Sequence, residues 1–223
     1  MSEDDTPGLI GKIKDKLIAS KKKTAASGRH LTGQVDQAHE NRLPPGQHLV
    51  EKWPVLDLGA QPDVSLANWR LRIEGAVENT VTLAFDDFMA LPQVDYVSDI
   101  HCVTTWSRYD NHWSGVASQT IIDLVKPTAD AAYVIFHSYD GYTTNIKLDV
   151  FNEPDVLLAH SWEGEQLTRE HGGAVRAIVP QWYFWKSAKW IRRIEFSPVD
   201  KPGFWEERGY HNDADPWTEQ RYS

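Results

Sequence analysis

Short runs of strand type, rather than long helical stripes, dominate the chain from residue 43 onward. In the clearest run, Trp69, Leu71 and Ile73 alternate with Arg70, Arg72 and Glu74 as far as Gly75, which is the pattern of a half-buried strand. Further strands are expected within residues 80–85, 132–136, 144–148, 175–180 and 190–196. These runs predict a domain built mainly on a sheet.

Only short helices are expected between the strands. One covers residues 86–91, with Asp86 or Asp87 as its cap and Pro92 after its end, and a second covers residues 119–126 and is stopped by Pro127. Because strands and helices do not alternate regularly, a doubly wound fold is not expected. The sequence predicts an α+β fold around a mixed sheet.

Residues 1–42 form a separate, basic arm, and residues 43–223 form one domain. The arm contains no tryptophan, whereas the rest of the chain contains all ten, enough for a sizeable core. Within residues 9–23, apolar residues recur at roughly helical spacing among lysines, which predicts a short basic amphipathic helix. Such a helix either packs on its own domain or a second subunit, or docks on a membrane surface or a partner.

The N-terminal sequence also predicts a location. Residues 1–23 lack the apolar core of a secretory signal and contain no twin arginine. The chain has a single cysteine, so it forms no intramolecular disulfide, which fits a reducing compartment. We therefore expect the protein in the cytoplasm.

A cationic segment stands out in an acidic chain. The net charge of −9 argues against nucleic acid as a partner. Residues 171–193 nevertheless contain five Lys or Arg side chains and no acidic one: Arg176, Lys186, Lys189, Arg192 and Arg193. The same segment has Gly172 and Gly173 and the aromatic run 182–185, which together suit a flat heterocycle with a phosphate. The alternative is a solvated strand edge protected by its charges.

Cys102 lies in "SDIHCVTTWSRYDNHW", with His101 and Arg108 as potential cationic neighbours. A lone cysteine is most often a small buried apolar residue, but cations stabilise a thiolate as a nucleophile or a soft metal ligand. A cysteine-dependent hydrolase and a non-catalytic module that binds anions or proteins both remain open. No compact zinc ligand set is visible. One thiolate suffices as a protein ligand only where a cofactor brings the others.

Three motifs resemble the sulfite oxidase superfamily of molybdopterin-dependent oxidoreductases. They are "HCVTTWS", "HGGAVRAIVPQWYFWKSAKWIRRIEF" and "KPGFWEERGYHNDADPW", and the resemblance covers residues 43–218. It is strongest to the small cytoplasmic-type members and to the catalytic subunit of bacterial protein-methionine-sulfoxide reductases. It implies an α+β fold and a mononuclear molybdenum held by one pyranopterin dithiolene (molybdopterin), oxo groups and one cysteine.

The resemblance also implies roles for individual residues. Cys102 matches the molybdenum ligand, and Arg176 matches the arginine at the phosphate end of the cofactor. Further cofactor contacts are implied at Ser187, Ala188 and Lys189, at Ser138 with His137 as the alternative, at His171 where the reductase has an asparagine, and, upstream, at His48, Lys52 and Trp53.

The segment "YTTNI" resembles the one that contains the active-site tyrosine of sulfite oxidases, so Tyr142 is expected to face the substrate. The alternative is a turn tyrosine packed after Gly141. His101 and Arg108 are the candidates for lining the substrate funnel. Eukaryotic sulfite oxidases have a denser arginine cluster there, which puts sulfite in doubt.

The expected activity is two-electron oxygen-atom transfer on a small oxyanion, S-oxide or N-oxide. The chain of 223 residues leaves no room for a cytochrome b5-like haem domain. The electron-transfer partner is therefore expected to be a separate molecule.

Overall fold

The computed structural model describes residues 42–223. The predicted arm and its helix within residues 9–23 lie outside the described residues, apart from Arg42. Within residues 42–223, no helix combines the length and the apolar character needed to cross a membrane.

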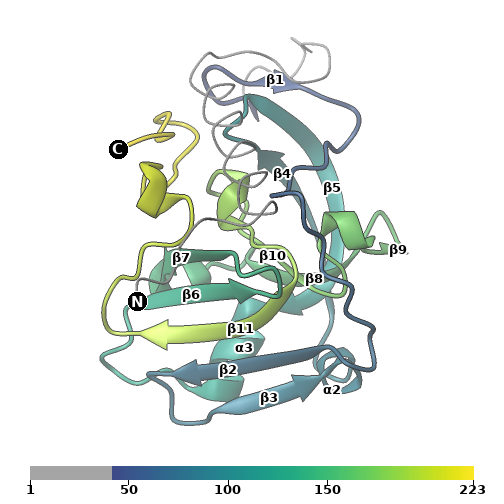
Figure 1. Ribbon diagram of the computed structural model, residues 1–223, viewed down its shortest axis with the longest axis vertical. Helices are drawn as coiled ribbons and strands as arrows, with labels where there is room; N and C mark the ends of the chain where they lie inside the picture. Colours follow the sequence, from purple (N-terminus) through teal and green to yellow (C-terminus); the bar gives the residue numbers. More distant parts are fainter. Residues whose placement is uncertain (1–41) are drawn as a thin grey trace, which may run out of the picture.

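The described residues fold around two mixed sheets, where the sequence predicted one (Figure 1). The five-stranded sheet has the order β3 (Val81–Ala84), β2 (Arg70–Gly75), β11 (Ile191–Ser197), β6 (Tyr133–Ser138), β7 (Thr143–Lys147). Its only parallel pair is β11 with β2. In β2 the predicted alternation is confirmed, since Leu71 and Ile73 are fully buried and Arg70 and Arg72 are exposed.

The six-stranded sheet has the order β1 (His48–Leu49), β5 (Trp106–Ala117), β8 (Leu157–Trp162), β10 (Arg176–Ile178), with β4 (Val94–His101) beside β5 and β9 (Glu165–Gln166) beside β8. Here β1 and β5 are the parallel pair. The strands β4, β5 and β8 were not expected from the sequence. They are nevertheless the strands that position the cysteine, because β4 and β5 form the hairpin around it.

The helices are short, as expected. Among residues 42–223 they are α2 (Phe85–Met89), α3 (Ser118–Val125) and α4 (Leu148–Phe151), together with the 3-10 turns η2 (Arg169–His171), η3 (Phe184–Lys186) and η4 (Glu206–Arg208). The predicted cap of α2 was wrong: the cap residue is Ala84, and Asp87 accepts a hydrogen bond from its backbone N–H at 2.9 Å. Helix α3 ends before Pro127, as predicted, with Lys126 in a left-handed conformation.

Two apolar clusters hold the fold together. The first lies between the five-stranded sheet and α3, where Phe136, Ile194 and Ile121 are fully buried. The second joins the six-stranded sheet to η3 and to the C-terminal segment, and it contains Cys102. Each fully buried aliphatic or aromatic side chain contributes roughly 1.5–3 kcal/mol. The second cluster surrounds the site described next.

Candidate functional site

Cys102 occupies a tight turn at the end of the β4–β5 hairpin. Its backbone N–H donates to the carbonyl of Trp106 at 2.8 Å, and its own carbonyl accepts from the N–H of Thr105 at 3.0 Å. Thr105 has a left-handed conformation with φ of 78°, which lets the chain reverse here. The Cys102 side chain is buried, and its sulfur lies 3.1 Å from the Thr104 hydroxyl oxygen.

Two distant segments hold this turn in place. Gln47 donates from its side-chain amide to the carbonyl of Cys102 at 3.2 Å. Arg221 donates from its guanidinium to the carbonyl of Val103 at 2.6 Å. The backbone around the thiol is therefore tied to both ends of the described chain.

The thiol opens into a cavity that we call the Cys102 pocket, with about 860 Å³ of empty space including its mouth. It is lined by Trp53, Pro54, Leu56, Asp57, Leu58, Cys102, Val103, Thr104, Trp106, Asp140, Tyr142, His171, Arg176, Phe184, Trp185, Ser187, Ala188, Lys189, Trp190, Trp205 and Tyr210.

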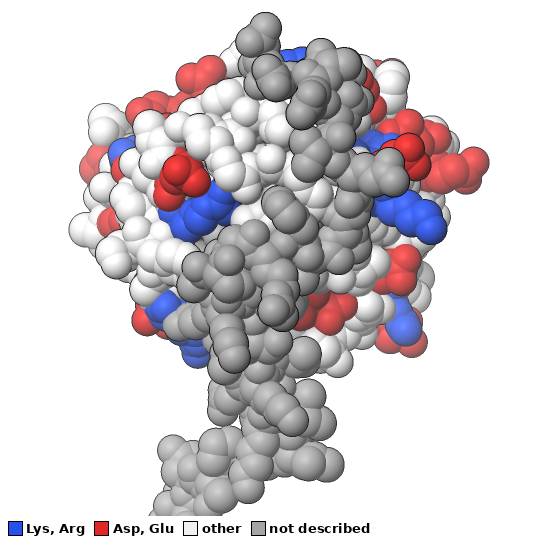
Figure 2. Space-filling view, turned by 90° about the horizontal axis from the view of Figure 1, so that it is seen from above, with Lys and Arg blue, Asp and Glu red and all other residues white. Residues whose placement is uncertain are grey.

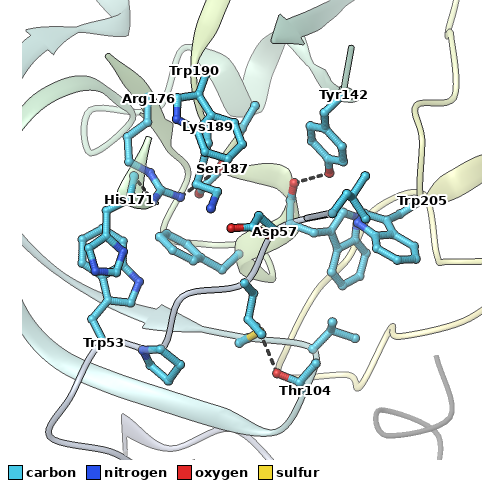
Figure 3. Close-up of a pocket in the computed structure, with 18 of the residues that line it drawn as sticks. Trp53, Asp57, Thr104, Tyr142, His171, Arg176, Ser187, Lys189, Trp190 and Trp205 are labelled. Atoms are coloured by element: carbon cyan, nitrogen blue, oxygen red, sulfur yellow. Dashed lines mark hydrogen bonds between the residues drawn. The ribbon is translucent and has the colours of Figure 1, made fainter. Parts of the chain in front are cut away.

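One side of the pocket, the cationic wall, is formed by His171, Arg176 and Lys189 (Figure 3). Arg176 is 2% exposed and donates to the carbonyls of His171 at 2.8 Å and Ser187 at 2.9 Å. Burial lowers the pKa of Arg176 to about 9, so the guanidinium stays cationic at neutral pH. Within residues 42–223, carbonyl oxygens and no carboxylate hold it. A buried cation of this kind suits an anionic ligand.

The rest of the cationic wall is closely packed. The His171 ring stacks on Trp53 with centroids 3.9 Å apart and planes 9° apart. Burial first, and then the charges of Arg176 and Lys189, lower the pKa of His171 to about 4, so the imidazole is neutral. Gly172 has φ of +104°, and a Cβ there would lie 3.0 Å from the Cβ of Lys189. Only glycine therefore fits this position beside the two cations.

The opposite side, the aromatic wall, is formed by Tyr142, Trp185, Trp205 and Tyr210. Figure 3 shows Tyr142 and Trp205 facing His171 and Arg176 across the pocket. Tyr142 donates from its hydroxyl to the carbonyl of Trp185 at 2.6 Å. Burial and then the neighbouring Glu206 raise the pKa of Tyr142 well above its ordinary value, so the phenol keeps its proton.

The charge arrangement in the pocket differs from that on the surface. On the face shown in Figure 2, acidic and basic side chains of the described residues lie interspersed. In the pocket, the cations gather on one wall, where Trp53 and Trp190 pack against them, and Tyr142 and Trp205 lie opposite. The described residues contain no group of three or more His, Cys, Asp or Glu side chains that could hold a metal ion.

The pocket brings together eight of the residues selected from the sequence. They are Trp53, Cys102, Tyr142, His171, Arg176, Ser187, Ala188 and Lys189. It does not bring His48, Lys52, His101, Arg108 or Ser138 to its lining. His48 is buried in β1 and Lys52 is exposed.

His101 and Arg108, the two residues expected to line the substrate funnel, do not line the pocket. The ring Nδ1 of His101 lies 2.8 Å from the Ser107 hydroxyl, and burial lowers the pKa of His101 to about 4. Arg108 donates to Asn111 and pairs with Glu163 at 3.2 Å. Both side chains thus stabilise the hairpin from outside the pocket.

The structure differs from the expectations for Ser138 and Lys186. Ser138 is 1% exposed, and its hydroxyl has no hydrogen-bond partner within residues 42–223. The ring Nε2 of its alternative, His137, lies 3.2 Å from the carboxylate Oε2 of Glu195. Lys186, one of the five cations of the segment 171–193, is fully buried against Glu206 and does not line the pocket.

Sequence reasoning missed several lining residues. Thr104 follows the cysteine by two positions, and a hydroxyl so close to a lone thiol was a usable signal. Trp205 and Tyr210 lie in the quoted motif "KPGFWEERGYHNDADPW", but nothing local in that motif assigns them to the pocket. Asp57 enters from a loop that contained no recognisable pattern.

Known proteins match this sequence and this fold. Residues 58–205 match the family model described as the oxidoreductase molybdopterin binding domain. The uncharacterized oxidoreductase YuiH of Bacillus subtilis is 44% identical over 193 residues, which cover 86% of this chain and 96% of that protein. The catalytic subunit MsrP of the protein-methionine-sulfoxide reductase of Campylobacter jejuni is 28% identical, and the match covers 67% of this chain and 57% of MsrP.

A solved structure confirms the fold. The sulfane dehydrogenase SoxCD from Paracoccus pantotrophus matches with a TM-score of 0.58 and 20% identity, over 62% of this chain and 40% of that one. At this identity the match supports only the architecture of the fold. The sequence match over residues 58–205 and the close relative in Bacillus subtilis decide the family: this chain belongs to the molybdopterin-binding oxidoreductases.

Proposed function

We propose that the protein is a molybdenum-dependent oxidoreductase that transfers an oxygen atom to or from a small substrate. The observation behind the proposal is that a buried thiol, Cys102, and a buried cation held by no carboxylate within residues 42–223, Arg176, line the same pocket. A molybdopterin cofactor needs both, one at its metal and one at its phosphate. The family of the chain supports the same cofactor.

The donor set of the pocket fits such a group. Cys102 offers a single soft ligand, which suffices for a metal that arrives with its other ligands. Arg176 and Lys189 offer positive charge on one wall, and Gly172 keeps the backbone close between them.

The protein's own residues have distinct tasks in this proposal. Cys102 would hold the metal, with Thr104 hydrogen-bonded to its sulfur. Arg176, Lys189 and the segment through Ser187 would hold the phosphate end. The bound cofactor supplies two-electron oxygen-atom transfer chemistry, and the protein sets access, orientation and charge. Tyr142 keeps its proton and would face the substrate from the aromatic wall.

The division of charge in the pocket favours an uncharged substrate. All the cationic side chains of the lining belong to the cationic wall, where they would be engaged by the cofactor. Apart from Cys102, Thr104 and Ser187, the remaining lining is aromatic or aliphatic, with the carboxylates Asp57 and Asp140, which disfavour an anion. We therefore propose an organic S-oxide or N-oxide rather than sulfite or nitrate. The relative MsrP is named as a protein-methionine-sulfoxide reductase, which agrees with this class.

The proposed reaction balances as a reduction. The S=O or N–O bond breaks, two electrons and two protons are taken up, and the products are the sulfide or amine and one water. We propose that the electrons come from a separate donor protein. Residence in the cytoplasm, and a contact of residues 9–23 with a membrane surface or a subunit, stay predictions.

The cofactor is tested on the full chain produced with an active molybdenum-cofactor pathway. Elemental analysis is expected to give about one molybdenum per chain, and oxidation is expected to release a fluorescent pterin. Arg176→Met is expected to lower both values at least severalfold, because a buried cation to the phosphate is lost, while Arg192→Met on the exposed side of β11 leaves them unchanged. A folded sample with neither molybdenum nor pterin would overturn the proposal.

The substrate class is tested on the same preparation. With reduced viologen as the electron donor, dimethyl sulfoxide and trimethylamine N-oxide are expected to be reduced, and nitrate is not. With ferricyanide as the acceptor, sulfite is expected to be oxidised slowly or not at all. A preference for sulfite or nitrate would refute the uncharged-substrate class but not the cofactor. Catalysis of hydrolysis by metal-free protein would favour the cysteine-dependent hydrolase instead.

A further inference from the structure

Behind the aromatic wall lies a fully buried ion pair that the proposed chemistry does not use. The ammonium of Lys186 lies 2.6 Å from the carboxylate of Glu206, and the two side chains are 0% and 2% exposed. Lys186 belongs to η3 and Glu206 begins η4. The pair therefore joins two segments that are twenty positions apart in the chain: η3 lines the pocket through Trp185, and η4 lies between the lining residues Trp205 and Tyr210.

Hydrogen bonds extend the pair to a third segment. Lys186 donates to the backbone carbonyl and to the side-chain oxygen of Asn145, at 2.9 and 3.0 Å. Glu206 accepts through Oε1 from the Trp185 indole at 2.9 Å and from the Thr144 hydroxyl at 3.1 Å. Thr144 and Asn145 lie in β7, directly after Tyr142. The cluster thus fixes β7, η3 and η4 relative to one another.

The aromatic wall depends directly on these three segments. Tyr142 donates to the carbonyl of Trp185 at 2.6 Å, and the indole of Trp185 donates to Glu206. Both ends of Trp185 are therefore held, one by Tyr142 and the other by the ion pair. Residues 187–189, which follow Lys186 in the chain, line the pocket, and Lys189 belongs to the cationic wall. The ion pair between Lys186 and Glu206 is thus connected to both walls of the pocket.

Stability alone does not account for a pair of this kind. The desolvation of two buried charges offsets most of their attraction, and an apolar pair of the same volume is often as stable or more so. One oxygen of Glu206, Oε2, also has no hydrogen-bond partner within residues 42–223, which further lowers the net gain. What an apolar pair cannot supply is the directed contact to Trp185, Thr144 and Asn145.

We propose that Lys186 and Glu206 are positioning residues, which set the Tyr142 phenol and the Trp185 ring against the substrate side of the pocket. They act through Tyr142 and Trp185 and do not touch the cofactor or the substrate. The kinetic part of the proposal rests on the proposed function, whereas the structural part concerns this chain alone.

The first test measures geometry in the cofactor-free chain. The protein is labelled with 3-fluorotyrosine, and the fluorine resonance of Tyr142 is assigned by its loss in Tyr142→Phe. Four variants are compared with the parent: Glu206→Gln, Lys186→Met, the double variant Lys186→Met with Glu206→Leu, and the control Glu195→Gln. Glu195 is a fair control because it pairs with Arg193 and His137 on the five-stranded sheet, away from the pocket.

The double variant separates positioning from stability. Each single variant leaves one buried charge without its counter-charge and is expected to lower the thermal midpoint by roughly 5 °C or more. The double variant is expected to regain most of that midpoint but to keep a displaced Tyr142 resonance, because the directed contacts are still missing. Glu195→Gln is expected to leave the resonance where it is in the parent. A double variant that regains both the midpoint and the parent resonance would overturn the proposal.

The second test measures turnover in the loaded enzyme, with dimethyl sulfoxide and reduced viologen. In the double variant, kcat is expected to fall about tenfold or more, as expected for a misplaced contact near the reacting groups, with a smaller change in KM. Parent kinetics in the double variant would contradict the proposal. A parent that contains no molybdenum would instead defeat the proposed function and leave the resonance test valid.

Discussion

The sulfur of Cys102 and the hydroxyl of Thr104 lie 3.1 Å apart inside the pocket. A hydroxyl that donates to a thiolate stabilises the charged form, so its removal raises the pKa of the thiol. In the cofactor-free chain, Thr104→Val is expected to slow alkylation of Cys102 by iodoacetamide at pH 8 by about threefold, the equivalent of a weak hydrogen bond. The control Thr128→Val removes a hydroxyl that bonds Asp130 on the surface. Equal rates in all three proteins would show that Thr104 does not stabilise the thiolate.

Loss of the cysteine is expected to separate cofactor binding from turnover. Cys102→Ser should retain a measurable share of the pterin, because Arg176 and Lys189 remain on the cationic wall. Turnover with dimethyl sulfoxide should fall by about a hundredfold or more, because the only soft ligand is gone. Pterin fluorescence and viologen oxidation measure the two quantities. Full activity in Cys102→Ser would exclude Cys102 as the metal ligand.

Gly172 offers a test of close packing in the cationic wall. Gly172→Ala introduces a Cβ that would lie 3.0 Å from Lys189 and 3.2 Å from Arg176. Gly164→Ala is a matched control, because Gly164 also has a positive φ of +80° but has open space around it. Gly172→Ala is expected to destabilise the chain by about 1–2 kcal/mol more than the control and to reduce the pterin content. Equal losses in a urea titration would show that backbone conformation alone matters there.

The neutral state of His171 predicts a pH dependence of folding. Its pKa is lowered from 6.5 to about 4, so the unfolded chain binds the proton more readily than the folded one. The stability that His171 contributes is therefore present above pH 6.5 and is lost as the pH falls toward 4. Between pH 7 and 5, the free energy of unfolding should fall by about 2 kcal/mol more in the parent than in His171→Asn.

Urea unfolding of the cofactor-free chain at the two pH values measures that difference. His112→Asn removes an exposed histidine of β5 that does not line the pocket, and is the control. If His171→Asn matches the parent, the ring is protonated equally in both states.

The five-stranded sheet was largely predictable because local pattern and burial agree in it. In β2, the alternation of Leu71 and Ile73 with arginines corresponds directly to one buried and one exposed face. In β5 this correspondence fails. Ser107 and Asn111 are fully buried although they are polar, and the pairing with β8 shifts at Ser114 and Gly115. A strand of this kind has no period-two signal, so the hairpin around the cysteine was not expected.

Residues of the candidate site were predictable where they belong to a local sequence pattern that is rare in the chain. The lone cysteine and a cationic segment without acids led to Cys102, Arg176 and Lys189. The failures concern charges whose partners come from elsewhere in the chain. Lys186 is paired with Glu206, and Arg108 with Glu163. A sequence shows that a cation exists, but its availability depends on long-range contacts that local pattern does not show.

The contact between Arg221 and the carbonyl of Val103 spans 118 positions of the chain. On a ribosome, the cysteine turn is synthesised long before the arginine that holds it emerges. Until residue 221 is available, Gln47 can hold the turn but Arg221 cannot. The cysteine turn therefore receives one of its contacts late in synthesis, from a residue that does not itself line the pocket.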